Sequence, residues 1–252
     1  MRNNKLREML KAGTPAFGGW CVIPSGFSAE VVASLGYDFV ILDMQHGMMD
    51  YGDIVAMLQA MSAHGPTPLI RIPYGDYATA QRCLDAGAEG IIFPMINNGA
   101  EAADCVSACR YGPTGTRSIG PTRARLHLGG GPRHMDEQVM CIPMIETVSG
   151  VEHIDEILSV PGVAAIWTGP GDLRLSMGLE MPGAPDPRHT AALETVVERC
   201  RAHGIPIGCD AGTGAGAKNA LARGYGFVNL GWEVNVMAAA LGAELKIARE
   251  AN

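Results

Sequence analysis

The chain has 252 residues, of which 47% are hydrophobic and 18% charged, with a formal net charge of −7. Its apolar content excludes a disordered chain, and its acidity argues against a nucleic-acid or membrane-surface partner. Seven cysteines without a C-x-x-C pair, no apolar run of transmembrane length and a charged start without a signal peptide's apolar core predict a soluble cytoplasmic protein.

Apolar runs of strand length recur along the whole chain. They occupy residues 17–23, 39–43, 68–72, 90–95, 139–145, 163–168, 206–210 and 226–230. Helix-length segments follow them at 28–35, 51–64, 77–86, 100–110, 151–160, 189–203, 215–223 and 234–250. Strands that alternate with helices predict a parallel sheet, because each crossover needs room for a helix.

Eight such units in about 250 residues match the size of a (β/α)8 TIM barrel, an α/β fold. A doubly wound sheet is the alternative, although it usually has fewer strands and a clear switch point. No change in composition marks a linker, so we expect residues 1–252 to form a single domain. Two stretches interrupt the alternation. Residues 111–135 are rich in glycine and long enough to suggest a functional loop, whereas residues 178–188 resemble a plain surface loop.

Two carboxylates follow successive predicted strands. Glu146 ends the run 139–145, and Asp172 comes after the break Thr168-Gly169-Pro170-Gly171. In a parallel barrel the carboxyl ends of the strands share one mouth, where two carboxylates suit a hard divalent cation. The alternative for Asp172 is a residue that caps a short helix.

Arg71 lies within the apolar run Leu69-Ile70-Arg71-Ile72. A buried guanidinium requires an anion, because it is costly without one. That anion is either a carboxylate of the barrel, in a structural ion pair, or a substrate carboxylate or developing enolate oxygen.

His46 follows the second strand, three residues after Asp43. An aspartate that bonds one ring nitrogen of a histidine fixes its tautomer and raises the basicity of the other nitrogen. Asp85 is a candidate for this role, with a solvated or capping acid as the alternative.

The four lysines, Lys5, Lys11, Lys218 and Lys246, all lie outside the predicted strands and their carboxyl ends. A Schiff-base lysine is therefore not expected, and carbanion chemistry must use a metal. The loop Gly212-Thr-Gly-Ala-Gly216 is a weak phosphate-site candidate. The indoles of Trp20 and Trp232 either line the mouth or pack in the core or at an oligomer contact.

A set of motifs, in order along nearly the whole chain, resembles the HpcH/HpaI family of class II, metal-dependent pyruvate aldolases. The motifs are Gly19-Trp20, Leu42-Asp-Met-Gln-His-Gly47, Arg71-Ile-Pro73, Leu84-Asp-Ala-Gly87, Gly115-Thr-Arg-Ser118, Pro143-Met-Ile-Glu-Thr147 and Gly169-Pro-Gly-Asp-Leu173.

The resemblance implies a barrel, usually a homo-hexamer built as a trimer of dimers, with the last helix exchanged between paired subunits. It also implies that Glu146 and Asp172 hold Mg²⁺, Mn²⁺ or Co²⁺, to which a 2-oxo acid binds. PLP and NAD are not expected.

The remaining roles also come from the resemblance. The backbone of Gly171 and Asp172, in the segment that begins with Gly169 and Pro170, would bind the substrate carboxylate, near Trp20. Arg71 would stabilise the enolate oxygen. His46, oriented by Asp85, would move protons, and Asp43 would lie near the aldehyde, at a subunit boundary.

Two positions depart from the family pattern. Met144 stands where some of these aldolases have glutamine, and Gly171 where alanine is frequent. Both could alter the fit of the donor, so we expect either pyruvate or hydroxypyruvate. The predicted reaction is reversible aldol addition between a 2-oxo acid and an aldehyde through a metal-bound enolate. The alternatives are a citrate lyase β or malyl-CoA type lyase of acyl-CoA thioesters, and a non-catalytic barrel that binds a 2-oxo acid.

Overall fold

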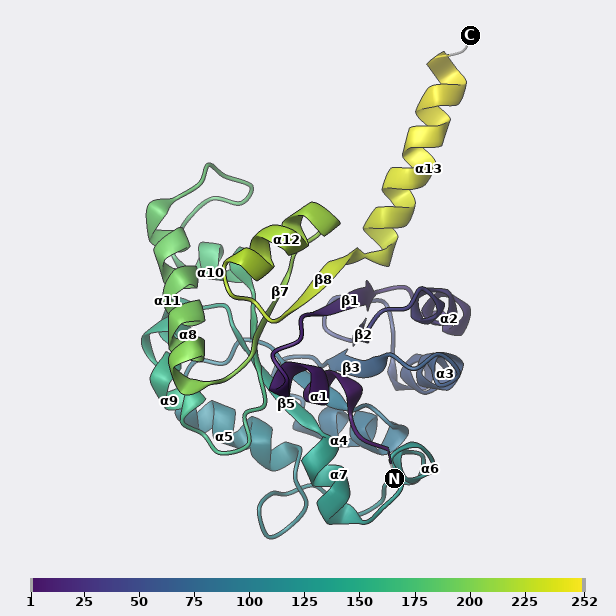
Figure 1. The fold of residues 1–252 in the computed structure, drawn as a ribbon, viewed down its shortest axis with the longest axis vertical. Helices are drawn as coiled ribbons and strands as arrows, with labels where there is room; N and C mark the ends of the chain where they lie inside the picture. Colours follow the sequence, from purple (N-terminus) through teal and green to yellow (C-terminus); the bar gives the residue numbers. More distant parts are fainter. Residues whose placement is uncertain (1, 251–252) are drawn as a thin grey trace.

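The computed structural model describes residues 2–250 and forms a closed barrel of eight parallel strands (Figure 1). The strands are β1 (Ala16–Cys21), β2 (Phe39–Asp43), β3 (Thr67–Arg71), β4 (Gly90–Phe93), β5 (Met140–Ile145), β6 (Ile166–Thr168), β7 (Ile207–Asp210) and β8 (Phe227–Trp232). Each strand pairs with the next in sequence, and β8 pairs with β1. The predicted (β/α)8 barrel is confirmed.

Helices connect the strands and surround them. They are α2 (Gly26–Ser34), α3 (Tyr51–Met61), α4 (Tyr77–Ala86), α5 (Gly99–Ala108), α8 (Val148–Glu152), α9 (Ile154–Leu158), α11 (Pro187–His203), α12 (Gly214–Ala222) and α13 (Glu233–Glu250). Four more were not among the predicted crossovers, namely α1 (Lys5–Lys11), α6 (Ala124–His127), α7 (Pro132–Gln138) and α10 (Pro170–Ser176).

Two predicted elements differ from the structure. The sixth strand was expected over 163–168 but begins at Ile166, and Val163 forms only an isolated bridge with Cys141. The helix expected over 151–160 begins at Val148 and is divided at His153, whose backbone leaves the helical region (φ −101°, ψ 19°). Strand β6 is therefore only three residues long.

Four aromatic side chains pack together among the aliphatic residues that fill the interior of the barrel. Trp20, Phe39, Trp167 and Phe227 are buried and meet edge to face or tilted, with centroids 5.3–6.4 Å apart. A Cβ atom on Gly18 would lie 2.2 Å from the Phe39 ring, so glycine at this strand position makes room for that ring. The packed interior leaves chemistry to the open end of the barrel.

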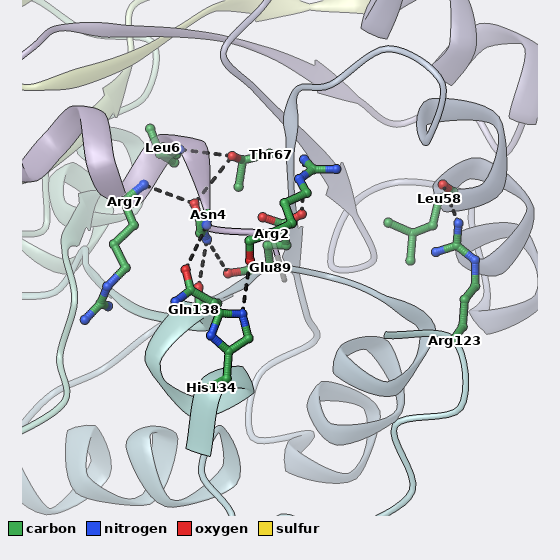
Figure 2. A network of polar contacts seen from close by, with 10 residues as sticks. All are labelled: Arg2, Asn4, Leu6, Arg7, Leu58, Thr67, Glu89, Arg123, His134 and Gln138. Carbon is green, nitrogen blue, oxygen red and sulfur yellow. Dashed lines mark hydrogen bonds and ion pairs between the residues drawn. The ribbon is translucent and has the colours of Figure 1, made fainter. Parts of the chain in front are cut away.

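The amino-terminal segment closes the opposite end of the barrel (Figure 2). The buried Asn4 side chain donates to the carbonyl oxygens of Glu89 and Gln138, both at 2.9 Å, and accepts from the backbone of Arg7. Leu6, fully buried, packs in the barrel interior, and its backbone N–H donates to the hydroxyl of Thr67. These bonds join α1 to the start of β3, to the turn before β4 and to α7.

Helix α13 follows β8 and projects away from the barrel (Figure 1). None of its residues is buried, in contrast to the other long helices. Within residues 2–250 we find no helix that combines the length and the hydropathy needed to cross a bilayer.

Candidate active site

Asp43, at the carboxyl end of β2, is the centre of a buried polar network. Its carboxylate is fully buried and accepts from both Nε (2.9 Å) and Nη2 of Arg71 on β3. The β2–β3 register places the two residues side by side. Trp20 Nε1 donates to the same carboxylate at 3.1 Å, and the backbone N–H groups of Gln45 and His46 donate at 3.0 and 3.3 Å.

These contacts supply the buried anion that Arg71 requires. The guanidinium forms a structural ion pair, and Asp43 orients it. Asp43 was expected near the aldehyde at a subunit boundary. Its side chain is fully buried in this chain and is held by Arg71 and Trp20. Nη1 of Arg71 takes part in neither bond with Asp43.

Two indoles flank the Arg71 guanidinium. Its carbon lies 4.7 Å from the Trp20 ring centre and 5.8 Å from that of Trp232. The two rings stack on each other, with centroids 5.6 Å apart and planes 10° apart. Trp232 Nε1 donates to Asp210 at 2.9 Å, and Asp210 also accepts from the side chain of Asn229. Trp20 is thus both a core residue and part of this network.

Glu146, directly after β5, is 1% exposed. Its Oε1 accepts from the backbone N–H of Met95 at 2.7 Å. Burial raises the pKa of Glu146 to about 7; the Met95 bond and the charge of Arg71 oppose this, and the Asp172 carboxylate adds to it. The charges of Asp172 and Arg71 thus act on the Glu146 carboxylate in opposite directions.

Met95 is the only non-glycine residue with positive φ (60°) among residues 2–250. This left-handed conformation is strained for a long side chain and turns the N–H toward Glu146. Nothing in the sequence around Met95 signals this role, so sequence reasoning missed it.

Gly169 provides the space that Glu146 occupies. A Cβ on Gly169 would lie 2.1 Å from Oε2 of Glu146. A Cβ on Gly171 would lie 3.1 Å from Cε of Met181, so Met181 fills the space beside Gly171. Residues 178–188, expected to be a plain surface loop, therefore reach the site through Met181. Arg174 fixes this loop by donating to the carbonyls of Glu180 and Ala184 at 2.6 Å.

Asp172 lies in the first turn of α10, which begins at Pro170 after Gly169. Its helical position agrees with the capping alternative, yet no side-chain cap hydrogen bond is present at this helix. Asp172 is exposed, so its carboxylate is available to a ligand.

The donor set suits a hard divalent cation. The two candidate ligands, Glu146 and Asp172, are both carboxylates. A bound cation would relieve the repulsion between their negative charges. No group of three or more His, Cys, Asp or Glu side chains capable of holding a metal occurs in residues 2–250. Mg²⁺ commonly binds through one or two carboxylates and completes its shell with water and substrate oxygens. The residues therefore fit such an ion, with substrate or water as the remaining ligands.

The predicted pairing of His46 with Asp85 is not formed within the chain. His46 is exposed and follows β2 at the mouth, whereas Asp85 is in the last turn of α4, which ends at the opposite face. Asp85 instead accepts from Nη2 of Arg117 at 2.8 Å. Residues 111–135 lie at this closed face too, because they connect a helix to the next strand.

The remaining candidates contribute local structure. The segment 212–216 starts α12, where the Thr213 hydroxyl accepts from the backbone of Gly216 at 3.0 Å. Met144, the other departure from the family pattern, is a buried residue inside the barrel. All four lysines are on α1, α12 or α13, and none is at a strand end.

The comparisons with known proteins agree with this geometry. Residues 20–240 match the family model described as HpcH/HpaI aldolase/citrate lyase. The chain is 39% identical over 239 residues to a hydroxypyruvate/pyruvate aldolase of Rhizorhabdus wittichii, covering 94% of this chain and 95% of that protein. It is 33% identical over 253 residues to a 4-hydroxy-2-oxo-heptane-1,7-dioate aldolase of Salmonella arizonae, covering 98% and 94%.

A solved structure matches equally well. The crystal structure of an HpcH/HpaI aldolase/citrate lyase family protein from Burkholderia cenocepacia aligns with a TM-score of 0.90 at 29% identity. The alignment covers 98% of this chain and 100% of that one.

Proposed function

Because the chain belongs to the HpcH/HpaI aldolase/citrate lyase family, we propose that it is a divalent-metal-dependent aldolase acting on a 2-oxo acid and an aldehyde. The observation that carries this is a pair of carboxylates at the mouth: Glu146, directly after β5, and Asp172, in the first turn of α10 that follows β6. The charges of Asp172 and Arg71 both act on Glu146. Relatives named as hydroxypyruvate/pyruvate aldolases support a donor from this pair of acids.

Glu146 and Asp172 would hold the metal, Mg²⁺, Mn²⁺ or Co²⁺. When bound, the ion would polarise the keto group of the donor. Glu146 receives the Met95 N–H at one oxygen, which leaves Oε2 for the ion. The backbone N–H groups of Gly171 and Asp172, in the first turn of α10, would bind the donor carboxylate.

Arg71 would stabilise the negative charge that develops on the keto oxygen. Its Nε and Nη2 are held by Asp43, and the indoles of Trp20 and Trp232 lie beside it. A guanidinium fixed in this way needs little reorganisation when the charge appears. Asp43 thus acts through Arg71 rather than on the substrate.

His46, exposed at the mouth, would transfer the proton at C3 of the donor. Since Asp85 lies at the other end of the same barrel, it can orient His46 only if a neighbouring subunit brings its closed face to this mouth. This role of Asp85 therefore depends on an oligomer.

A homo-oligomer is also supported by α13. Met237, Leu241 and Leu245 repeat at helical spacing and are 48%, 64% and 52% exposed. A pocket of about 310 Å³ between α2 and the start of α13 is lined largely by apolar side chains, including Val31 and Leu35. A second copy that exchanged α13 would cover both surfaces, and a hexamer would be a trimer of such dimers.

Product analysis tests the proposed activity. The enzyme with Mg²⁺ or Mn²⁺ is incubated with pyruvate or hydroxypyruvate and a panel of aldehydes, and 4-hydroxy-2-oxo acids are detected by mass spectrometry. We expect aldol products that disappear with EDTA. Turnover of acyl-CoA thioesters without any aldol product would favour the thioester-lyase alternative.

A further inference from the structure

The closed face of the barrel carries a pocket of about 460 Å³ beside α1. Its lining includes the apolar residues Leu10, Met140, Val163, Ile205 and Pro206. Three cationic side chains complete it, Arg7 and Lys11 from α1 and Arg110 from the end of α5. Among residues 2–250, none of those that line this pocket carries a carboxylate side chain, although the chain as a whole has a net charge of −7.

The three cations differ from the other charged residues of α1. Lys5 pairs with Asp38 at 2.9 Å, and the Glu8 carboxylate accepts from Asn3 at 2.6 Å. In the described part of the chain, Arg7, Lys11 and Arg110 have no carboxylate within 4.0 Å. Arg110 makes two long bonds, to the carbonyls of Cys109 (3.3 Å) and Gly162 (3.4 Å). Arginine has five side-chain N–H donors, so most donors of Arg110 have no acceptor among the described residues.

The nearby acids offset this positive charge only in part. Burial and the charge of Arg110 lower the pKa of Arg7, and Glu137 on α7 opposes them. Asp136, on the same helix, uses both carboxylate oxygens to accept from the backbone of Tyr111 at 3.2 Å. The two guanidinium groups therefore repel each other next to a pocket, and a bound anion would relieve that repulsion.

We propose that this pocket binds a small organic anion with two or more negative charges, of the polycarboxylate or phosphate monoester type. Its volume is in the range of small-ligand sites, and its apolar wall with a cationic rim matches an anion that has a carbon skeleton. The site is at the end of the barrel opposite the mouth. The ligand is therefore not the aldol donor but an effector that stabilises α1 on the closed face.

The test is isothermal titration calorimetry of the full-length, EDTA-treated protein with citrate and with glucose 6-phosphate. We expect one binding site per chain for at least one of the two anions, weaker at 300 mM than at 50 mM NaCl. Lys11→Gln and Arg110→Gln should each weaken binding about tenfold or more, the scale of one charge-assisted contact. Which anion binds distinguishes a carboxylate from a phosphate ligand.

Two controls separate this site from others. Arg188→Gln removes the same charge from a 68% exposed side chain on α11 and should leave binding unchanged. Glu146→Gln should also leave it unchanged, because that variant alters only the mouth. Lys11 is exposed, so its variant tests the site even if Arg110→Gln is unstable. The absence of binding for both anions, or equal weakening by Arg188→Gln, would overturn the proposal.

Discussion

The sequence predicted some of the contacts made by single residues at the mouth and missed others. An arginine inside an apolar run predicted a buried anion, and the structure supplies Asp43. The sequence could not name this partner, since the pairing depends on the β2–β3 register, which neither strand encodes alone. Glu146 and Asp172 were predicted as metal ligands because each follows a strand. Met95 could not be predicted to contact Glu146, because this contact depends on an unusual backbone angle.

Replacing Arg71 tests the ion pair directly. Arg71→Gln leaves a buried carboxylate without its cation, so we expect the free energy of unfolding to fall by about 3 kcal/mol. Urea denaturation measures this. Arg199→Gln breaks an ion pair with Asp155 whose side chains are 44% and 53% exposed, and should cost much less, because water screens exposed pairs. An equal loss of stability in both variants would show that the buried Arg71–Asp43 pair contributes no more than an exposed pair.

Gly169→Ala places a methyl group where the Glu146 carboxylate lies. We expect metal affinity, followed by Mn²⁺ electron paramagnetic resonance, to fall at least about tenfold, because the carboxylate must move. Gly214→Ala is the matched control, since a Cβ there meets nothing within 4 Å. Unchanged Mn²⁺ binding in Gly169→Ala would show that Glu146 does not depend on this space.

At the scale of elements, hydrophobic runs predicted all eight strands and their crossover helices. The short α10 was missed because Gly169-Pro170-Gly171 resembles a simple break, although proline is favoured in a first helical turn. The long segment 111–135 was expected to be functional on its glycine content. Its place at the closed face follows from the direction of the chain, which composition does not express.

The exposed apolar side chains of α13 should hold the oligomer together. Leu241→Gln removes a 64% exposed apolar side chain from the middle of the helix, so we expect a smaller assembly by analytical ultracentrifugation. Lys246→Gln, on the same helix, should leave the mass unchanged. An unchanged mass in Leu241→Gln, with Met237→Gln behaving alike, would contradict exchange of α13.

At the scale of the whole molecule, the buried Glu89 beneath α1 should make the free energy of unfolding depend on pH (Figure 2). Burial raises its pKa from 4.5 to about 7, Arg2 opposes the shift from 3.3 Å, and Oε2 has no hydrogen-bond partner among the described residues. A raised carboxyl pKa contributes stability that is full below pH 4.5 and lost as the pH rises through 7.

Glu89→Gln should therefore remove part of the pH dependence. Between pH 5 and pH 8 we expect the free energy of unfolding of the wild type to fall by about 2–3 kcal/mol more than that of the variant. Urea denaturation at both pH values of EDTA-treated protein measures the difference. Glu198→Gln, on the surface of α11, should follow the wild type; parallel pH profiles for Glu89→Gln would contradict the assignment.

The central claim is that the mouth of the barrel forms an enolate of a 2-oxo acid. It is tested by NMR of the C3 protons of pyruvate and hydroxypyruvate in D2O, with EDTA-treated enzyme before and after addition of Mg²⁺, Mn²⁺ or Co²⁺. We predict exchange that requires the metal, needs no aldehyde and falls at least about a hundredfold in Glu146→Gln but not in Glu198→Gln. No exchange with any of the three metals would contradict the account.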